Sequence, residues 1–140
     1  MNRIARLLVP FAAAAMLGGC GIKESFEKAD AAIARFHGDL DAANYARIWT
    51  QADPELRKAG DKAAFEKLLG AVHTKLGAVK ETKQVGWNTN ASTSGTYLTA
   101  TYQTTFEKGT GTERFTYRKG DEDAVTLVNY AIDSQDMMLN

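Results

Sequence analysis

The chain has 140 residues, and its Lys and Arg residues total 17, as do its Asp and Glu residues. Hydrophobic residues make up 44% and charged residues 24%, values of an ordinary globular protein that exclude a disordered or fibrous chain. Arg3 and Arg6 precede residue 20 and no acid does, so residues 20–140 have 15 basic and 17 acidic residues, a net charge of −2. Because basic and acidic residues are interspersed, the basic stripe that phosphate recognition needs is missing, which argues against a nucleic-acid binder. The length is that of one domain.

The first nineteen residues have the organisation of an export signal. A basic segment precedes an apolar stretch from residue 7 to residue 17, and two glycines come before Cys20. The apolar stretch is about eleven residues long, too short for a bilayer, which takes about twenty. We therefore expect residues 1–19 to be a signal peptide that is cleaved before Cys20.

The four residues at the end of this signal are Leu17, Gly18, Gly19 and Cys20. They resemble the lipobox of bacterial lipoproteins, in which the cysteine receives acyl chains, and two or more such chains hold a protein stably on a membrane. Cys20 is the only cysteine in the chain. The alternative is an ordinary signal peptide in which this thiol is incidental. The resemblance implies a lipidated N-terminus at residues 20–23 and, because glycine and not aspartate follows the cysteine, attachment to the outer membrane facing the periplasm.

Two helices are expected next. Apolar residues recur every three or four positions, which predicts an amphipathic helix with one apolar side, and they are Ile22, Phe26, Ala29, Ile33, Phe36 and Leu40. Gly38 predicts the end of this helix. A second helix is expected from Ala42 to about Thr50, and Asp39 and Asp41 are expected to cap its start.

Two further helical segments follow. A brief turn of helix is expected from Pro54 to about Ala59, because proline is tolerated in a first turn and Asp53 can cap it. A longer helix is expected from about Lys62 to Leu76, with Gly77 as its stop signal. Its apolar face consists of Phe65, Leu68, Leu69, Val72 and Leu76.

After residue 77 the apolar period changes from helical to two, and threonine, valine and aromatic residues dominate. Four strands are expected, at Val79 to Ala91, Thr96 to Glu107, Thr112 to Lys119 and Ala124 to Asp133. Short polar connections containing glycine join them, as antiparallel hairpins require. The prediction is an α+β domain at residues 24–133, in which the N-terminal helices pack on one face of a curved four-stranded antiparallel meander. Residues 134–140 are expected to be a C-terminal tail.

The outer face of this sheet is the candidate binding surface. Alternation places threonines and charges on one side of the second and third strands, and large apolar residues on the other. The surface consists of Trp87, Tyr97, Thr99, Thr101, Gln103 and Arg118, with the two aromatic residues as anchors. The alternative is a solvated face, since threonine is a good exposed strand residue.

Three segments resemble a known fold family. They are the turn and aromatic helix from Asp41 to Trp49, the strand from Gly95 to Tyr102, and the sequence Glu113-Arg114-Phe115. These segments follow a long helix and precede a last strand, and in this order they resemble the nuclear transport factor 2-like, or cystatin-like, α+β cone. More narrowly, the chain resembles small exported proteins of uncharacterised families in that group. The resemblance covers about residues 24–133 and implies a fold shared by enzymes and binding modules.

Enzymes of this cone use an acid or histidine and a tyrosine in the pocket between sheet and helices. The candidates here are Asp39, Asp41, Tyr45, His73, Tyr102 and Tyr130. Their simpler interpretations are helix caps and core packing. His37 and His73 are the only histidines, and because suitably spaced partners are missing we expect neither a metal site nor a cofactor.

The sequence therefore predicts a membrane-anchored periplasmic lipoprotein that acts as a non-enzymatic binding module, with a protein or a small apolar ligand of the envelope as its partner. One alternative is a small isomerase- or hydrolase-like enzyme of the same fold. Such an enzyme would place Asp39 or Asp41 in an enclosed pocket facing Tyr102 or Tyr130. A second alternative is an immunity or inhibitor lipoprotein.

Overall fold

The computed structural model describes residues 18–140, with side chains from residue 21 onward. The expected signal peptide up to Leu17 lies outside the described residues, and Gly18, Gly19 and Cys20 are described only as helical backbone. The helices are α1 (Gly18–Asp41), α2 (Tyr45–Gln51), α3 (Pro54–Ala59), α4 (Lys62–Leu76) and α5 (Gln135–Leu139). The strands are β1 (Val79–Ser92), β2 (Gly95–Phe106), β3 (Gly109–Lys119) and β4 (Val125–Asp133), with a 3₁₀ turn η1 (Asp121–Asp123) before β4.

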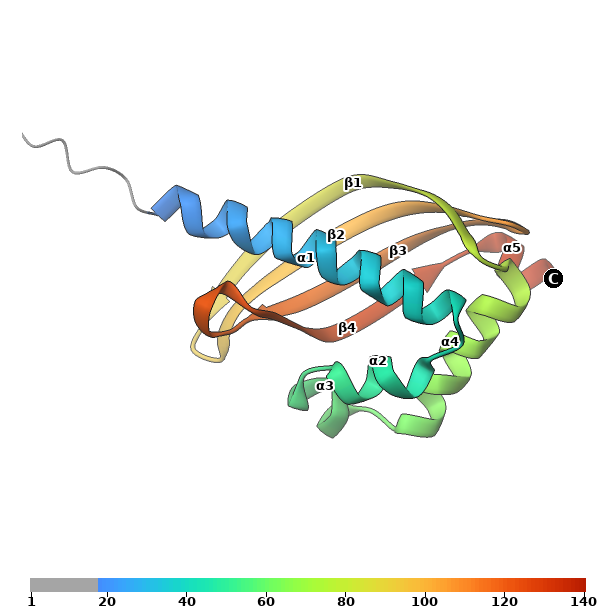
Figure 1. Cartoon of the computed structure of the whole chain (residues 1–140), viewed down its shortest axis with the longest axis horizontal. Coiled ribbons are helices and arrows are strands. Elements are labelled where there is room, and N and C mark those ends of the chain that lie inside the picture. The colour runs from blue at the N-terminus through green and yellow to red at the C-terminus, as the bar shows by residue number, and fades with distance from the viewer. Residues whose placement is uncertain (1–17) are drawn as a thin grey trace, which may run out of the picture.

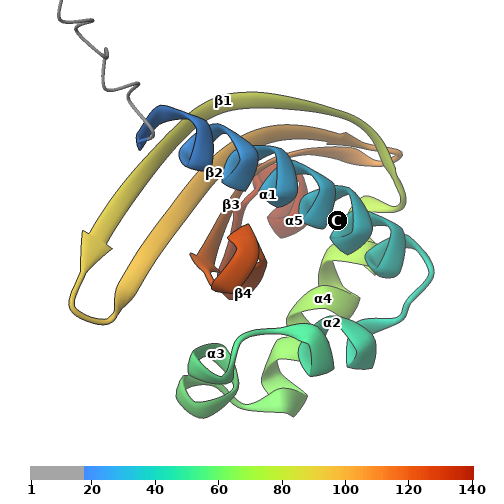
Figure 2. The same ribbon diagram turned by 60° about the vertical axis from the view of Figure 1, so that its left-hand side comes forward.

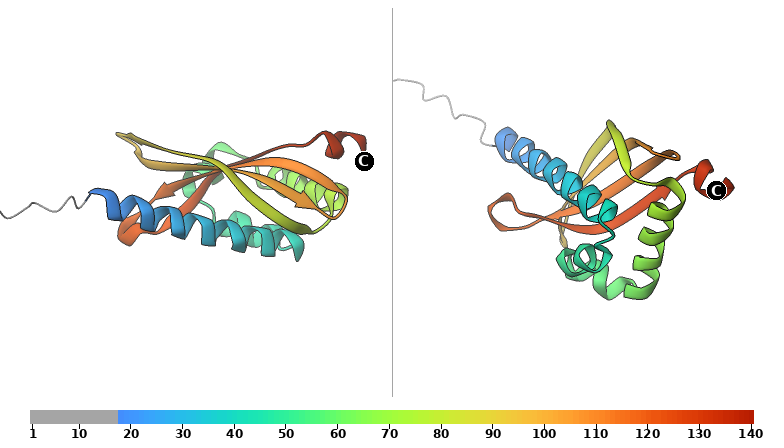
Figure 3. Two further views of the ribbon diagram at one scale, coloured as in Figure 1. Left: turned by 90° about the horizontal axis from the view of Figure 1, so that it is seen from above. Right: turned by 45° about the vertical axis from the view of Figure 1, so that its right-hand side comes forward.

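The four strands form one antiparallel sheet in the order β1-β2-β3-β4, so the predicted meander and the α+β class are confirmed. The sheet is strongly curved, and α1 runs along its concave side (Figure 2). Helices α2, α3 and α4 gather on the β4 side (Figure 1). The N-terminal end of α1 and the C-terminus lie at opposite ends of the domain (Figure 3).

The core lies between α1 and the concave face of the sheet. The C-terminal part of the predicted apolar stripe of α1, Ala29, Ile33, Phe36 and Leu40, is buried there, whereas Ile22 at its start is exposed. Helix α4 closes the core with Leu69, Val72 and Leu76. Strands β2 and β3 contribute every second residue to the core, and the residues between these face outward. The buried residues of the two strands are Leu98, Ala100, Tyr102, Thr104, Phe106, Gly111, Glu113, Phe115 and Tyr117.

The boundary between the first two helices differs from the prediction. Helix α1 continues through Gly38 to Asp41, because Leu40 is fully buried and its packing outweighs the weak helix preference of one glycine. Helix α2 accordingly begins at Tyr45 and not at Ala42. The prediction that Asp39 and Asp41 cap α2 is wrong: the residue at the cap position is Asn44, and the Asp41 carboxylate accepts the backbone N–H of Val79 at 3.1 Å.

The other predicted helices are confirmed. Asp53 caps α3 by accepting the N–H of Glu55, and Pro54 occupies the first turn. Helix α4 ends at Leu76 because Gly77 adopts φ +77°, a left-handed value that favours glycine. The last residues, for which the sequence predicted a tail and no helix, form helix α5, which Ser134 caps by accepting the N–H of Met137.

Candidate functional site

A carboxylate is buried in the core at the middle of β3. Glu113 has no solvent exposure, and its Oε1 accepts the Thr104 hydroxyl at 2.5 Å and lies 2.8 Å from Nε2 of His37. Its Oε2 accepts the Tyr130 hydroxyl at 2.7 Å. The cluster joins α1 to β2, β3 and β4, so one acid is hydrogen-bonded to three other elements of the fold.

The environment of this cluster is aromatic and closed. The Phe36 ring lies 4.7 Å from the Tyr130 ring and 5.1 Å from Phe115, measured between centroids. Burial, followed by the neighbouring Glu113, raises the pKa of Tyr130 well above its ordinary value, so this hydroxyl stays protonated and donates. Both oxygens of Glu113 have partners inside the protein, as a buried carboxylate requires. The arrangement therefore stabilises the core, and its acid is not exposed to a substrate.

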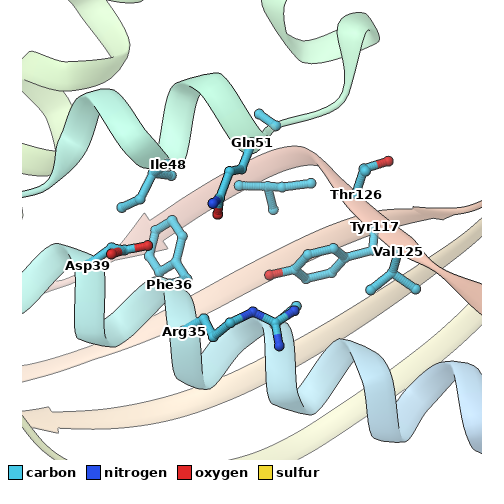
Figure 4. Close-up of a pocket in the computed structure, with 11 residues that line it drawn as sticks. Arg35, Phe36, Asp39, Ile48, Gln51, Tyr117, Val125 and Thr126 are labelled. Carbon is cyan, nitrogen blue, oxygen red and sulfur yellow. The ribbon is translucent and has the colours of Figure 1, made fainter.

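A cavity of about 130 Å³ lies beside this core, between α1, α2 and the paired strands β3 and β4 (Figure 4). Phe36, Ile48 and Leu127 form apolar walls. The polar side chains at the cavity are Arg35, Asp39, Gln51, Tyr117 and Thr126. The remaining lining residues are Ala32, Ala52 and Val125.

Tyr117 is the buried polar residue of this cavity. Its side chain reaches in from β3 with the hydroxyl toward the space between α1 and α2 (Figure 4), although the residue is only 3% exposed. Burial raises the pKa of Tyr117, and the nearby Arg35 guanidinium opposes that rise. The hydroxyl is therefore a neutral hydrogen-bond donor at physiological pH.

A second polar cluster fixes α3 to the sheet. The Asp53 carboxylate accepts two nitrogens of Arg118 and the Thr126 hydroxyl, the latter at 2.6 Å. The Tyr97 hydroxyl donates to Oε2 of Glu55 at 2.9 Å. Two residues of the expected binding surface, Tyr97 and Arg118, are therefore held by α3 and its cap.

Trp87 lies elsewhere, on the side of β1 that faces α1. Its ring packs against Phe26 with centroids 4.6 Å apart, and 62% of the residue remains exposed. Ile22, Lys23, Asp30 and Gln84 complete a cleft between the start of α1 and β1. We call these six residues the Trp87 cleft.

The remaining residues of the expected binding surface lie together on the outer face. Thr99 and Thr101 line a shallow polar hollow, and the Thr99 hydroxyl is 3.2 Å from the Thr116 hydroxyl. Gln103 is exposed further along β2. The structure thus brings the two threonines together in one hollow, which Trp87 also borders, although the Trp87 ring packs against Phe26 of α1.

The candidate catalytic residues do not converge on one site. Asp39 lines the cavity, but the tyrosine there is Tyr117 and not Tyr102 or Tyr130. Tyr102 donates to Asp30 of α1. Tyr45 packs at the edge of the core, and His73 lies on α4 with Nδ1 buried and without a partner among the described residues.

Sequence reasoning did not propose Glu113 or Tyr117 as site residues, although Glu113 belongs to a segment that carries the family resemblance. Each is two residues from Phe115 in β3, so alternation places both on the core face of the sheet together with Phe115. An acid in that position was the available signal for the buried cluster.

In residues 18–140, no helix has the length and apolar character needed to cross a membrane. Within residues 21–140, whose side chains are described, no group of three or more His, Cys, Asp or Glu side chains is placed to hold a metal ion.

Comparison with known families gives one match. The family model described as a protein of unknown function, DUF4019, matches residues 26–130. The chain belongs to the DUF4019 family. The matched region runs from the first turns of α1 to Tyr130 in β4, and so includes the buried Glu113 cluster and the cavity. No curated protein matches the chain.

Proposed function

We propose that this DUF4019 protein is a lipoprotein of the bacterial envelope, anchored to the outer membrane through Cys20, that binds a ligand without catalysis. The Trp87 cleft is the observation that supports this most, because its first residue, Ile22, is two positions after the cysteine. We also propose that the α+β fold is a nuclear transport factor 2-like cone.

The Trp87 cleft has the character of a surface that meets lipid headgroups. Ile22 is 43% exposed and Trp87 62%, and Val85 in the same strand is 48% exposed. Tryptophan is enriched at membrane interfaces because its ring is apolar and its N–H is polar. At a rise of about 1.5 Å per helical residue, Phe26 lies roughly 9 Å along α1 from residue 20. Acyl chains on Cys20 would thus hold this cleft at the bilayer surface.

The binding role is favoured over catalysis by the state of Glu113, the acid in the core. Glu113 is surrounded by donors that it already uses, and it is completely buried. A general acid or base must be within hydrogen-bond reach of the substrate proton. The cavity beside the core offers polar groups at an accessible surface, which is what binding needs.

The anchor is tested by metabolic labelling of the full-length chain in a bacterium with an alkyne fatty acid, followed by intact-mass analysis and membrane fractionation. We expect a mature protein that begins at Cys20, bears fatty acid and fractionates with the outer membrane. The matched control, Cys20→Ala, should take up no label. Mature protein that begins at another residue, or that has no fatty acid, would overturn the proposal.

The orientation of the cleft is tested separately in vesicles that contain brominated phospholipids. The chain has two tryptophans, so Trp49→Phe leaves Trp87 as the sole tryptophan. In the lipidated protein we expect bromine to quench Trp87, whereas Trp87→Phe, which leaves Trp49, should show little quenching. Equal quenching of the two variants would show that the cleft does not face the lipid, and would leave the anchor itself standing.

A further inference from the structure

The cavity between α1, α2, β3 and β4 contains a donor without a partner. The hydroxyls of Tyr97, Tyr102 and Tyr130 each donate to a carboxylate, of Glu55, Asp30 and Glu113 respectively. Tyr117 is buried more deeply than any of these, at 3% exposure, yet none of the hydrogen bonds within residues 21–140 includes its hydroxyl. The Tyr117 hydroxyl reaches the surface of the cavity and is not used by the protein itself, so it is free to donate to a molecule that enters the cavity.

A positive charge lies beside this hydroxyl. The Arg35 guanidinium is close enough to oppose the rise in the pKa of Tyr117, and both side chains line the cavity (Figure 4). Within the described residues Arg35 forms no ion pair. Two donors, one of them charged, therefore converge on the same space, and together they suit a carboxylate.

The other polar groups of the cavity are already engaged or neutral. Asp39, one helical turn after Arg35, has its carboxylate 3.7 Å from Nη1 of Arg47. The Thr126 hydroxyl donates to Asp53. Gln51 is uncharged and exposed at the rim. The unbalanced charge of the cavity is thus the positive charge of Arg35.

The size and walls of the cavity define the rest of the ligand. Its volume of about 130 Å³ is close to that of an apolar protein cavity of about 150 Å³ that accommodates benzene. Phe36, Ile48 and Leu127 present apolar surface to it. A six-membered ring or a short branched chain would fill this space.

We propose that this cavity binds a small organic carboxylate, whose oxygens accept from Arg35 and from the Tyr117 hydroxyl while its apolar body packs against Phe36, Ile48 and Leu127. This assignment rests on the binding role proposed above and is independent of the lipid anchor. Because Tyr117 remains protonated, its hydroxyl donates to the ligand and does not repel it.

Benzoate is the probe, and benzyl alcohol, which has the same ring but no charge, is its control. Titration calorimetry uses the protein as the cell processes it, purified in detergent. We expect saturable benzoate binding and at least about tenfold weaker binding of benzyl alcohol, since a hydrogen bond to a charged group contributes that much. Tyr117→Phe, which keeps the ring and the fold, should weaken benzoate binding by about tenfold.

Arg35→Gln should weaken benzoate binding at least as much as Tyr117→Phe and should make it insensitive to salt. The matched control is Arg114→Gln, an exposed arginine on the outer face of β3, which should bind benzoate as the unaltered protein does. Absence of benzoate binding, equal binding of the alcohol, or unchanged binding by Tyr117→Phe would each overturn the proposal. Because no membrane is used, these outcomes leave the lipid anchor untouched.

Discussion

Arg118 binds the Asp53 carboxylate through two nitrogens, with Nη2 2.6 Å from Oδ1 and Nε 3.0 Å from Oδ2. The same carboxylate caps α3 through the N–H of Glu55 and accepts the Thr126 hydroxyl of β4. The Asp53 side chain is 3% exposed and that of Arg118 33%. One acid thus joins the start of a short helix to two strands.

Replacing Asp53 by asparagine should destabilise the protein by about 1–3 kcal/mol, because the amide cannot accept all of these hydrogen bonds and leaves the charge of Arg118 without its partner. Denaturant unfolding followed by circular dichroism measures this loss. The control is Arg47→Gln, which removes an exposed ion pair of 3.7 Å and should leave the free energy of unfolding unchanged. Equal effects of the two substitutions would refute a role for Asp53 in docking α3.

The same residue makes stability depend on pH in acid. Burial acts to raise the pKa of Asp53, but the hydrogen bonds from Thr126, the Glu55 amide and Arg118 together lower it below its ordinary value of 3.8. The folded state therefore releases this proton more readily than the unfolded chain does. The stabilisation is fully present above pH 3.8 and is lost as the pH falls through the lower, folded-state pKa. The difference in unfolding free energy between the unaltered protein and Asp53→Asn should shrink over that window, and a constant difference would contradict the assignment.

Glu113 should be essential to the core. Glu113→Ala leaves a cavity and removes the acceptor of the Thr104 and Tyr130 hydroxyls and the partner of His37, so we expect a loss of about 3 kcal/mol or more. Tyr130→Phe removes only one of these hydrogen bonds and should cost less, about 1.5–3 kcal/mol. Urea unfolding compares both with Thr112→Ala, an exposed neighbour on β3. A stable Glu113→Ala protein would show that the cluster is dispensable to the fold.

Local sequence signals predicted the elements whose boundaries depend on local chemistry. Helix α4 and its end at Gly77 follow from apolar spacing and a left-handed glycine, and the faces of β2 and β3 follow from alternation. The continuation of α1 past Gly38 was not predictable in this way, because it depends on the burial of Leu40 by distant residues.

The candidate site was less predictable than the fold. Most of β1 is exposed and lacks alternation, and the strand contains register shifts, so its sequence does not assign the face of Trp87. Pairing places Trp87 opposite Ala100, whose side chain faces the core, whereas Tyr97 pairs with Arg118 on the outer face. The cavity at Tyr117 arises where two helices and two strands meet, and sequence spacing does not report such a space.

Alanine substitution should have opposite effects at two glycines: it should disturb local packing at Gly109 and stabilise the helix at Gly38. A Cβ at Gly109 would lie 2.6 Å from Cβ of Asp136, whose Oδ2 accepts the N–H of Thr110 at 2.9 Å. Gly109→Ala should therefore displace α5 from β3, and because α5 has no buried residue the rest of the fold should persist. Amide exchange at Thr110 should become faster and the C-terminus should become sensitive to protease.

A Cβ at Gly38 meets nothing within 4 Å, so Gly38→Ala should stabilise α1 by about 0.5–1 kcal/mol. Unchanged exchange in Gly109→Ala, or destabilisation by Gly38→Ala, would contradict these local packing arrangements.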